Sequence, residues 1–409
     1  MDLLTIIYFA YAFISLYFLF LFLLVYIQNK DKMMHSPNYK RQYSLSMVVP
    51  CYNEESTIEE TVTSLLNSDY PGLERIYVVD DCSTDNSYSI MKRLAQKYGK
   101  VIALQTPKNT GKASGPKNYG ARFVTTELIG FTDADSYPDK DAISKAVGFF
   151  DNQEIAGVTS LILAKHGNKL IERLQEIEYK VIAFTRKLLG FLDAIYVMPG
   201  PLAIYRKSAF DKVRGFDETN LTEDIEITWN LASKGYKVEM SMPSRVVTVV
   251  PNKIKQWYSQ RVRWNLGGIQ TIIKYKSLFM KKGIFGSFIL PFFIFSWLLG
   301  LFGLGLMAYN FLRRLIVQYI STTYSIGAQT AILTMRDINL SPNVLFFFGF
   351  VLFFLGLAFT IFVLVFLREK EFKSMNLFDI GLYTLVYLSV YPIIMIASSY
   401  KFLRGKNSW

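Results

Sequence analysis

Residues 46–55 read SMVVPCYNEE, a short apolar run followed at once by polar and acidic side chains. The same pattern recurs along the chain, and the runs Ser46–Val49, Ile76–Val79, Val101–Leu104 and Leu128–Thr132 predict buried strands. Amphipathic segments separate these runs. The alternation is typical of a mainly parallel sheet covered by helices, and it predicts an α/β domain over residues 44–250.

Polar and acidic segments follow three of the predicted strands. They are Pro50–Glu55, Asp80–Asp85 and Asp133–Asp135. Ligands of open sheets bind outside the carboxyl ends of the strands, so we expect these segments to meet in one crevice. A single acidic strand end is usually a turn or a helix cap, whereas three in register indicate a site. The spacing of Asp133 and Asp135 lets both carboxylates share a divalent ion with substrate phosphates.

Three further segments carry local signals. Ser56 and Glu59 form an S-x-x-E capping box before a predicted helix. Asn168–Gly190 is amphipathic and predicts a helix that is either part of the core or interfacial, and its basic residues favour the interface. Gly200–Arg206 predicts a rigid loop that runs into a strand, and Thr222–Asp224 begins another helix. Taken by itself, Thr222–Asp224 is most simply the capped, acidic first turn of an ordinary helix.

The loop Asn109–Gly120 contains glycines and lysines and leads toward a helix, so it can approach an anionic ligand closely. It is not a phosphate-binding P-loop, because Thr106 replaces the first glycine and Ala113 follows Lys112. No dinucleotide-binding glycine fingerprint or zinc-protease helix is present, and the only two histidines leave little material for a zinc site.

Lys255–Ile269 reads KQWYSQRVRWNLGGI and contains a Q-x-x-R-W cluster. Its arginine (Arg263) has a fork of donors for phosphate oxygens, Gln260 adds a neutral donor and acceptor, and the Trp264 indole has a flat face for a sugar. The cluster therefore suits a sugar diphosphate. The same residues also fit a basic amphipathic helix on a membrane surface.

Four segments are long and apolar enough to cross a bilayer of roughly 30 Å. They are Leu3–Ile27, Gly286–Tyr309, Val344–Leu367 and Ile380–Ser399. Basic residues follow the first segment, which places the α/β domain in the cytoplasm by the positive-inside rule. The same rule puts Arg368–Lys373 in the cytoplasm. Four crossings would place the basic C-terminal tail outside, unless Phe311–Met335 hides another crossing, and the sequence leaves this open.

Composition excludes few classes by itself. The formal net charge of +12 fits nucleic acid, an anionic membrane or an anionic substrate. Nucleic-acid binding is disfavoured, because the basic residues are spread along membrane-facing segments and no recognised binding module appears. The two cysteines, Cys51 and Cys82, lie in the predicted cytosolic region, so a disulfide framework is not expected.

The order D-D, D-x-D, T-E-D, Q-x-x-R-W resembles the processive, inverting family-two glycosyltransferases of membranes, which include hyaluronan, chitin, cellulose and poly-N-acetylglucosamine synthases. The resemblance covers roughly Met47–Gly268 and the flanking spans. It implies a GT-A fold in the soluble region. The expected organisation is an N-terminal transmembrane helix and linker (1–43), a GT-A domain (44–250), interfacial helices (251–285) and a C-terminal transmembrane region (286–409).

The resemblance also implies roles for individual residues. Asp224 would be the catalytic base, and Asp133 and Asp135 would bind Mg²⁺ or Mn²⁺. The nucleotide-binding residues would be Tyr52, Glu54, Asp80, Asp81, Lys112, Asp133, Gln260 and Arg263. The acceptor-binding residues would be Gly200, Pro201, Glu223 and Trp264. The run Ser114–Lys117 departs from the family's more usual residues after Gly111-Lys112 and bears on donor or acceptor recognition.

The expected function is a cell-membrane glycosyltransferase that moves a sugar from a UDP-sugar, with inversion, to a growing polysaccharide exported through its own helices. Four spans are fewer than many polymer synthases carry, and a homo-oligomer or a non-processive enzyme would account for that. One alternative is transfer of a single sugar to a lipid acceptor. Another is an inactive nucleotide-binding membrane transporter or scaffold. Membrane lipids are expected partners in each case.

Overall fold

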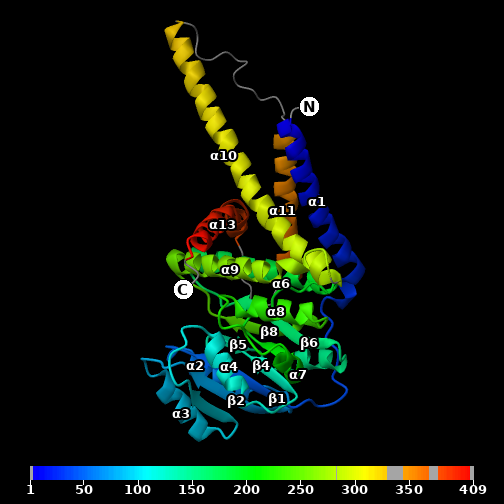
Figure 1. The fold of residues 1–409 in the computed structure, drawn as a ribbon, viewed down its shortest axis with the longest axis vertical. Coiled ribbons are helices and arrows are strands. Elements are labelled where there is room, and N and C mark those ends of the chain that lie inside the picture. Colours follow the sequence, from blue (N-terminus) through cyan, green and yellow to red (C-terminus); the bar gives the residue numbers. More distant parts are fainter. Residues whose placement is uncertain (1–2, 282, 329–343, 368–375, 406–409) are drawn as a thin grey trace.

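The computed structural model describes residues 3–281, 283–328, 344–367 and 376–405. A sheet domain forms one end of the molecule, helices α6 (Leu170–Gly190) and α9 (Ile254–Tyr275) form a layer above it, and the long apolar helices project from that layer (Figure 1). The predictions for the end of Phe311–Met335, for Arg368–Lys373 and for the last residues of the tail concern residues outside the described ranges.

The sheet is mixed, with the strand order β3-β2-β1-β4-β7-β6-β8-β5. The four predicted strands are confirmed as β1 to β4 and are mutually parallel, whereas β7 runs antiparallel to both β4 and β6. The strands are β1 (Leu45–Cys51), β2 (Leu73–Asp80), β3 (Val101–Gln105), β4 (Leu128–Phe131), β5 (Ser136–Pro138), β6 (Ile155–Ala164), β7 (Ala203–Arg206) and β8 (Lys237–Thr248).

Helices pack their apolar sides against both faces of the sheet, so β1 is buried along its whole length. Met47 and Val49 point into one core cluster with Val62 of α2, while Val48 points into the other cluster with Phe184 of α6. The helices of the sheet domain are α2 (Ile58–Leu66), α3 (Ser87–Lys97), α4 (Ser114–Ala121), α5 (Ser144–Val147), α7 (Lys207–Lys212) and α8 (Glu223–Ser233), with a 3₁₀ turn η2 (Gly148–Asp151).

The predicted capping box before α2 is wrong. Thr57 occupies the N-cap position, and its side chain caps no backbone N–H of the helix. The Thr57 hydroxyl instead donates to the Glu54 carboxylate at 2.7 Å. Glu59 lies in the first turn and pairs with Arg93 of α3, so the acidic residue serves the packing of two helices rather than the cap.

Helix α6 (Leu170–Gly190) confirms the predicted amphipathic helix and joins the sheet domain to the apolar helices. Its Phe184 ring lies 5.9 Å from Phe359 of α11 and 5.8 Å from Tyr26 of α1, measured between ring centroids. The same phenylalanine belongs to the core cluster that lies between the sheet and α6. The layer that α6 forms with α9 is therefore fixed to both parts of the molecule.

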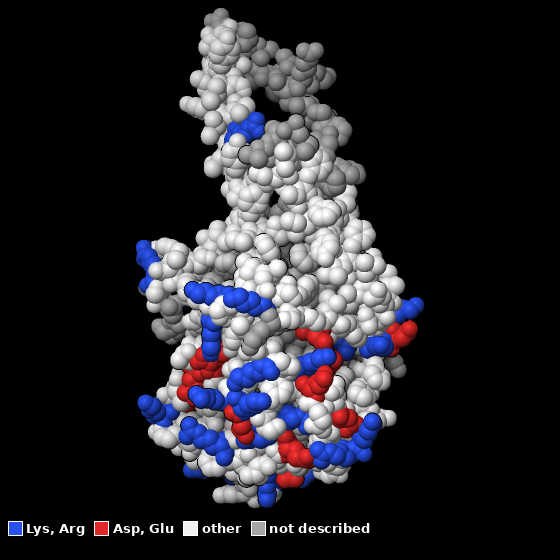
Figure 2. Space-filling view, turned by 45° about the vertical axis from the view of Figure 1, so that its right-hand side comes forward, with Lys and Arg blue, Asp and Glu red and all other residues white. Residues whose placement is uncertain are grey.

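The apolar helices are α1 (Leu3–Asn29), α10 (Leu290–Gly327), α11 (Val344–Phe366) and the C-terminal pair α12 (Leu377–Leu382) and α13 (Leu388–Leu403). Single 3₁₀ turns follow α1 (η1, Lys30–Lys32) and α9 (η3, Lys276–Leu278), and short π-helices precede α10 (η4, Phe285–Ile289) and join α12 to α13 (η5, Tyr383–Tyr387). Within the described residues, Ala12–Lys32, Phe285–Gly327 and Leu377–Leu403 are long and apolar enough to cross a membrane, and Phe350–Phe366 is a shorter apolar helix. In Figure 2 charged side chains gather on the sheet domain, and most of the projecting part lacks them.

Two expectations about the C-terminal region change. Residues 311–327 continue α10 as one helix of 38 residues, so no separate crossing begins at Phe311 within the described part. Helix α13 packs against α9, and the described chain ends beside α9 while the N-terminal end of α1 lies far from the sheet (Figure 1). The C-terminal end of the described chain therefore lies beside the α6–α9 layer, whereas a count of four crossings predicted it on the far side of a membrane.

Candidate active site

The three acidic strand ends meet in one cavity of about 760 Å³ at the carboxyl edge of β1, β2 and β4. The cavity continues upward between the sheet domain and the α6–α9 layer. The sequence-predicted residues that line it are Tyr52, Glu54, Asp81, Lys112, Asp133, Asp135, Gly200, Pro201, Glu223, Asp224, Gln260, Arg263 and Trp264. Segments more than 200 residues apart in sequence are thus brought to a single site.

The two aspartates after β2 have different surroundings. Asp80 is fully buried, and its carboxylate accepts hydrogen bonds from the Ser83 N–H and the Gln105 side chain, so it shapes the turn and does not line the cavity. Asp81 lines the cavity and accepts from the backbone N–H and the hydroxyl of Thr110, at 3.0 and 2.8 Å. Asp81 therefore also fixes the start of the basic loop.

Asp133 and Asp135 lie at the end of β4 and face the same cavity as Glu54. Burial raises the pKa of Asp135 to about 7, and the charges of Asp133 and Glu54 add to the increase. Two carboxylates held beside a third fit a divalent cation, which would relieve their mutual repulsion. In the described ranges no three His, Cys, Asp or Glu side chains are grouped so that they could hold a metal ion by themselves.

Lys117 is a site residue that the sequence did not single out. Its Nζ lies 3.2 Å from Oδ1 of Asp133 and donates to Oε1 of Glu223 at 2.9 Å, and the residue is 2% exposed. Burial alone would lower the pKa of Lys117, but the two carboxylates outweigh burial and raise it. The sequence feature that could have indicated Lys117 is the unusual run Ser114–Lys117. These four residues form the buried first turn of α4.

Asp224 lies in the first turn of α8. Its Oδ1 accepts a hydrogen bond from the N–H of Ile225 at 2.9 Å. Burial raises the pKa of Asp224 to about 6, and the neighbouring charge of Glu223 adds to the shift, while Lys117 opposes it. A carboxylate that lines the cavity and has a pKa near neutrality is suited to accept a proton from an acceptor hydroxyl.

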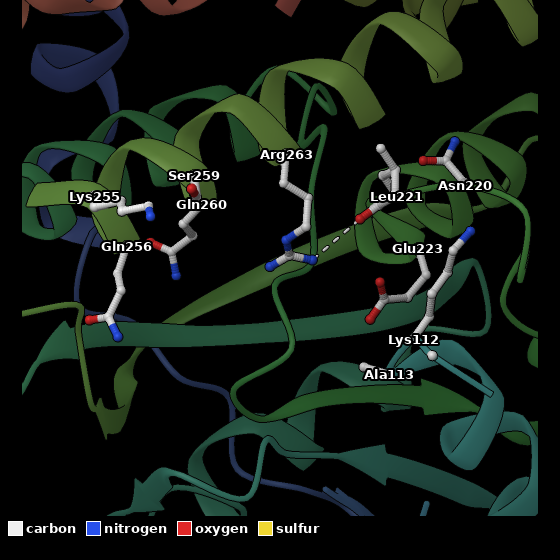
Figure 3. Close-up of a pocket in the computed structure, with 11 residues that line it drawn as sticks. Lys112, Ala113, Asn220, Leu221, Glu223, Lys255, Gln256, Ser259, Gln260 and Arg263 are labelled. Atoms are coloured by element: carbon white, nitrogen blue, oxygen red, sulfur yellow. Dashed lines mark hydrogen bonds between the residues drawn. The ribbon is translucent and has the colours of Figure 1, made fainter. Parts of the chain in front are cut away.

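Helix α9 (Ile254–Tyr275) carries the Q-x-x-R-W cluster and closes one side of the site. Its approach to α8 is close, because a Cβ on Gly267 would lie 2.0 Å from Oγ1 of Thr222. Arg263 donates to the carbonyl of Leu221 at 3.3 Å, as Figure 3 shows. The Arg261 guanidinium lies 4.1 Å from the ring centroid of Trp264, so one neighbour already stacks on that indole.

A second cavity of about 530 Å³ adjoins the first and shares several residues with it. Lys112, Lys255 and Arg263 give its lining a positive character, and Gln260 lies between the last two (Figure 3). The Lys112 ammonium donates to the carbonyls of Glu218 and Thr219 at 2.9 Å. A basic lining beside the acidic strand ends is the arrangement expected around a diphosphate and its metal ion.

Comparison with known proteins agrees with this geometry. Residues 46–214 match the model of glycosyl transferase family 2. A poly-β-1,6-N-acetyl-D-glucosamine synthase from Staphylococcus epidermidis is 29% identical over 233 residues, 56% of each chain. The corresponding synthase of Staphylococcus aureus (strain COL) is 27% identical over 280 residues, which are 68% of this chain and 66% of that one. The matched region thus spans between about half and two thirds of these relatives.

The fold is also shared with a solved structure. A mannosyltransferase from Pyrobaculum calidifontis, in complex with GDP-Man and Mn²⁺, superposes with a TM-score of 0.63 at 19% identity. The match covers 97% of this chain and 99% of that chain, so it includes the apolar helices as well as the sheet domain. The predicted GT-A fold is confirmed. Residues 46–214 thus match glycosyl transferase family 2, and the chain is similar in sequence to the poly-β-1,6-N-acetyl-D-glucosamine synthases.

Proposed function

We propose that the protein is a membrane glycosyltransferase that moves a sugar from a UDP-sugar, with inversion, to a growing polysaccharide. The observation that carries the proposal is the single cavity in which acidic strand ends, Asp224 and the Q-x-x-R-W helix face one another. The sequence likeness to polysaccharide synthases supports the choice of product.

The donor occupies the end of the cavity near the strands. Tyr52 is half exposed at the rim and offers its ring to the base, while Asp81 holds the loop that borders the nucleoside. Asp133 and Asp135 would hold the Mg²⁺ or Mn²⁺ ion. The bound ion would neutralise charge on the leaving diphosphate. Lys112, Gln260 and Arg263 approach the same diphosphate from the other side.

The acceptor lies between Asp224 and α9. Its hydroxyl oxygen attacks the anomeric carbon while the bond from that carbon to the diphosphate breaks, and Asp224 takes the hydroxyl proton. Attack from the side opposite the leaving group gives inversion. Lys117 does not touch the acceptor in this scheme. It holds Glu223 and Asp133 in place and keeps Asp224 ionised by its positive charge.

A membrane location follows from the same arrangement. Helices α1, α10 and α11 project from the α6–α9 layer in one direction, and the charged surface lies on the other side of that layer (Figures 1 and 2). We place the projecting helices in the cell membrane and the sheet domain in the cytoplasm, where nucleotide sugars are available.

Transfer of one sugar to a lipid acceptor is a second candidate. It is favoured by the upper end of the cavity, where Phe293 and Trp297 of α10 join the lining. An acceptor that enters there comes from the membrane side of the α6–α9 layer. The two candidates differ in product size and in solubility in organic solvent.

The proposal is tested by purifying the full chain in detergent and offering it a panel of radiolabelled UDP-sugars, with and without Mn²⁺ or Mg²⁺. We expect one donor to be consumed, and only with metal. Asp211→Asn serves as the matched control for any aspartate variant, because Asp211 is an exposed residue of α7 paired with Lys207. If no donor is consumed under any of these conditions, the transferase proposal is wrong.

A further inference from the structure

Arg186 of α6 is a buried cation that the proposed mechanism does not use. It lines the main cavity and is only 5% exposed. Its Nε is buried without a hydrogen-bond partner, and no ion pair to this guanidinium occurs within the part of the chain that the structure describes. Burial accordingly lowers the pKa of Arg186, and electrostatic interactions with Tyr196, Asp224 and Tyr179 oppose the shift.

The other buried cations near the site have partners. Lys117 pairs with Asp133 and Glu223, Arg261 pairs with Glu178, and Lys187 donates to the carbonyl of Met240 at 2.8 Å. An arginine buried beside a cavity without such a partner destabilises the fold, because the charge is removed from water and no carboxylate or carbonyl replaces that hydration. An anion in the cavity would supply the missing partner, and a phosphate group matches the geometry of a guanidinium.

The surroundings of Arg186 indicate what carries that anion. The cavity lining on this side is mainly apolar, with Ile182 of the same helix, Trp229 of α8, and Phe293 and Trp297 of α10. The ring of Phe293 lies 4.5 Å from that of Tyr196, measured between centroids, so α10 is in direct contact with this wall. A ligand that suits both features has a phosphate group joined to a hydrocarbon chain.

The donor diphosphate is a poorer occupant of this position. Its own binding groups are the aspartates after β4 and the basic residues Lys112 and Arg263, which come from other elements of the site. Arg186 instead belongs to the layer that contacts the apolar helices. Asp224 is the carboxylate whose charge acts on Arg186, so an anion held there is next to the proposed base.

We propose that the acceptor is an amphipathic lipid phosphate, whose phosphate group pairs with Arg186 while its hydrocarbon chain lies against Phe293 and Trp297. This inference rests on the proposed transferase activity, takes up its second candidate, the transfer of one sugar to a lipid acceptor, and names the chemical class of that acceptor. In the transfer, a phosphate oxygen forms a bond to the anomeric carbon as the bond from that carbon to the donor diphosphate breaks. The diphosphate leaves with the bonding electrons. The phosphate group enters as the monoanion, and its remaining proton passes to Asp224 as the new bond forms.

The test measures binding to the full chain in nanodiscs by thermal shift and by tryptophan fluorescence. The probes are farnesyl phosphate, farnesol, inorganic phosphate and UDP. We expect farnesyl phosphate to bind more tightly than farnesol, and Arg186→Gln to weaken farnesyl phosphate by about tenfold or more. Arg186→Lys should retain part of the affinity. Arg173→Gln removes an arginine of the same helix that pairs with Asp379, and it should leave the affinity for farnesyl phosphate unchanged.

Several results would overturn the inference. Equal affinity for farnesol and farnesyl phosphate, or no loss in Arg186→Gln, would show that Arg186 holds no lipid phosphate. Loss of UDP binding in Arg186→Gln would assign the arginine to the donor. Inorganic phosphate that displaces farnesyl phosphate with equal affinity would make free phosphate the ligand.

The two proposals fail separately. Donor turnover that depends on Asp224, without binding of the lipid phosphate, would contradict only the assignment of the acceptor. Binding at Arg186 without turnover of any donor would contradict the transferase activity and with it the role of the lipid as acceptor.

Discussion

Asp224 is the residue on which the proposed chemistry depends most. Its raised pKa, about 6, means that it is ionised and able to accept a proton above that pH and is protonated below it. We therefore expect kcat/KM to fall about tenfold per pH unit below about pH 6. The rate of UDP release is measured at saturating Mn²⁺, so that proton binding at Asp135 does not limit the reaction. A profile that stays flat to pH 4 would exclude Asp224 as the base.

Lys117 links two acidic groups of the site and acts on a third. Removing its charge in Lys117→Gln leaves the carboxylate of Glu223 buried without its partner, so we expect a loss of about 3 kcal/mol of stability. The same change raises the pKa of Asp224, because Lys117 normally lowers it. The acid limb of the pH profile should therefore move to higher pH.

The control for Lys117 is Lys108→Gln, an exposed lysine in the loop before the same helix. It should change neither the melting temperature nor the acid limb. An unshifted acid limb in Lys117→Gln would show that this lysine has only a structural role.

Gly200 leaves room for the Asp133 carboxylate. A Cβ at this position would lie 2.3 Å from Oδ2 of Asp133, so Gly200→Ala must displace the carboxylate. We expect the metal concentration for half-maximal activity to rise about tenfold, as for other changes beside a metal ligand. Gly99→Ala, where no atom lies within 4 Å of the new methyl group, is the control. An unchanged metal dependence in Gly200→Ala would argue against Asp133 as a ligand.

At the scale of elements, the position of α9 matters most. A buried ion pair between Arg261 of α9 and Glu178 of α6 holds it, and the hydroxyls of Tyr387 and Tyr391 also donate to Glu178. The polar cluster thus ties the helix that carries Gln260 and Arg263 to the C-terminal helices. A change in α13 can reach the site through these four side chains.

Neighbouring glycines of α9 provide a matched pair of variants. Gly267→Ala puts a methyl group 2.0 Å from Oγ1 of Thr222 and forces α9 away from α8, so we expect a loss of about 1–3 kcal/mol. Gly268→Ala meets no atom within 4 Å and should gain up to about 1 kcal/mol from the helix preference of alanine. Melting temperatures measured in detergent compare the two. Equal shifts would contradict the close contact between α8 and α9.

The strands could be predicted because the runs around Val48, Val78 and Ile129 are apolar, short and followed by polar residues. The cap of α2 could not, because Ser56 and Thr57 are both good caps and the choice depends on Glu54, which binds Thr57. Lys117 was hidden for a similar reason. Its two partners, Asp133 and Glu223, are distant in sequence, and only the folded chain brings them to α4.

The site was predicted better than the arrangement of the helices around it. Of the predicted site residues only Asp80 does not line the main cavity. Consecutive side chains at the end of β2 point in opposite directions, so Asp81 faces the cavity while Asp80 accepts a hydrogen bond from the Ser83 N–H. Apolar length alone predicted a crossing at Ile380–Ser399. It could not show that α13 packs on α9, since that contact depends on the tyrosines that reach Glu178.

At the scale of the whole molecule, the cavity connects the nucleotide side of the sheet with the apolar helices. Its lining begins at Tyr52 and Asp81, passes Asp224, and ends at Trp297 of α10. In the proposed scheme, a donor on the sheet side and an acceptor on the side of the apolar helices would therefore meet without either crossing the layer of α6 and α9. This arrangement is why we regard transfer at the membrane surface as the central property of the protein.

The most direct test of that claim is the size of the product formed from the consumed UDP-sugar by the wild-type chain and by Asp224→Asn, with Asp211→Asn beside them. We predict a metal-dependent polymer, or a single glycolipid if transfer stops after one sugar, from the wild type and the control alone. An equal yield of product from Asp224→Asn would contradict the account, because the base it assigns would then be dispensable.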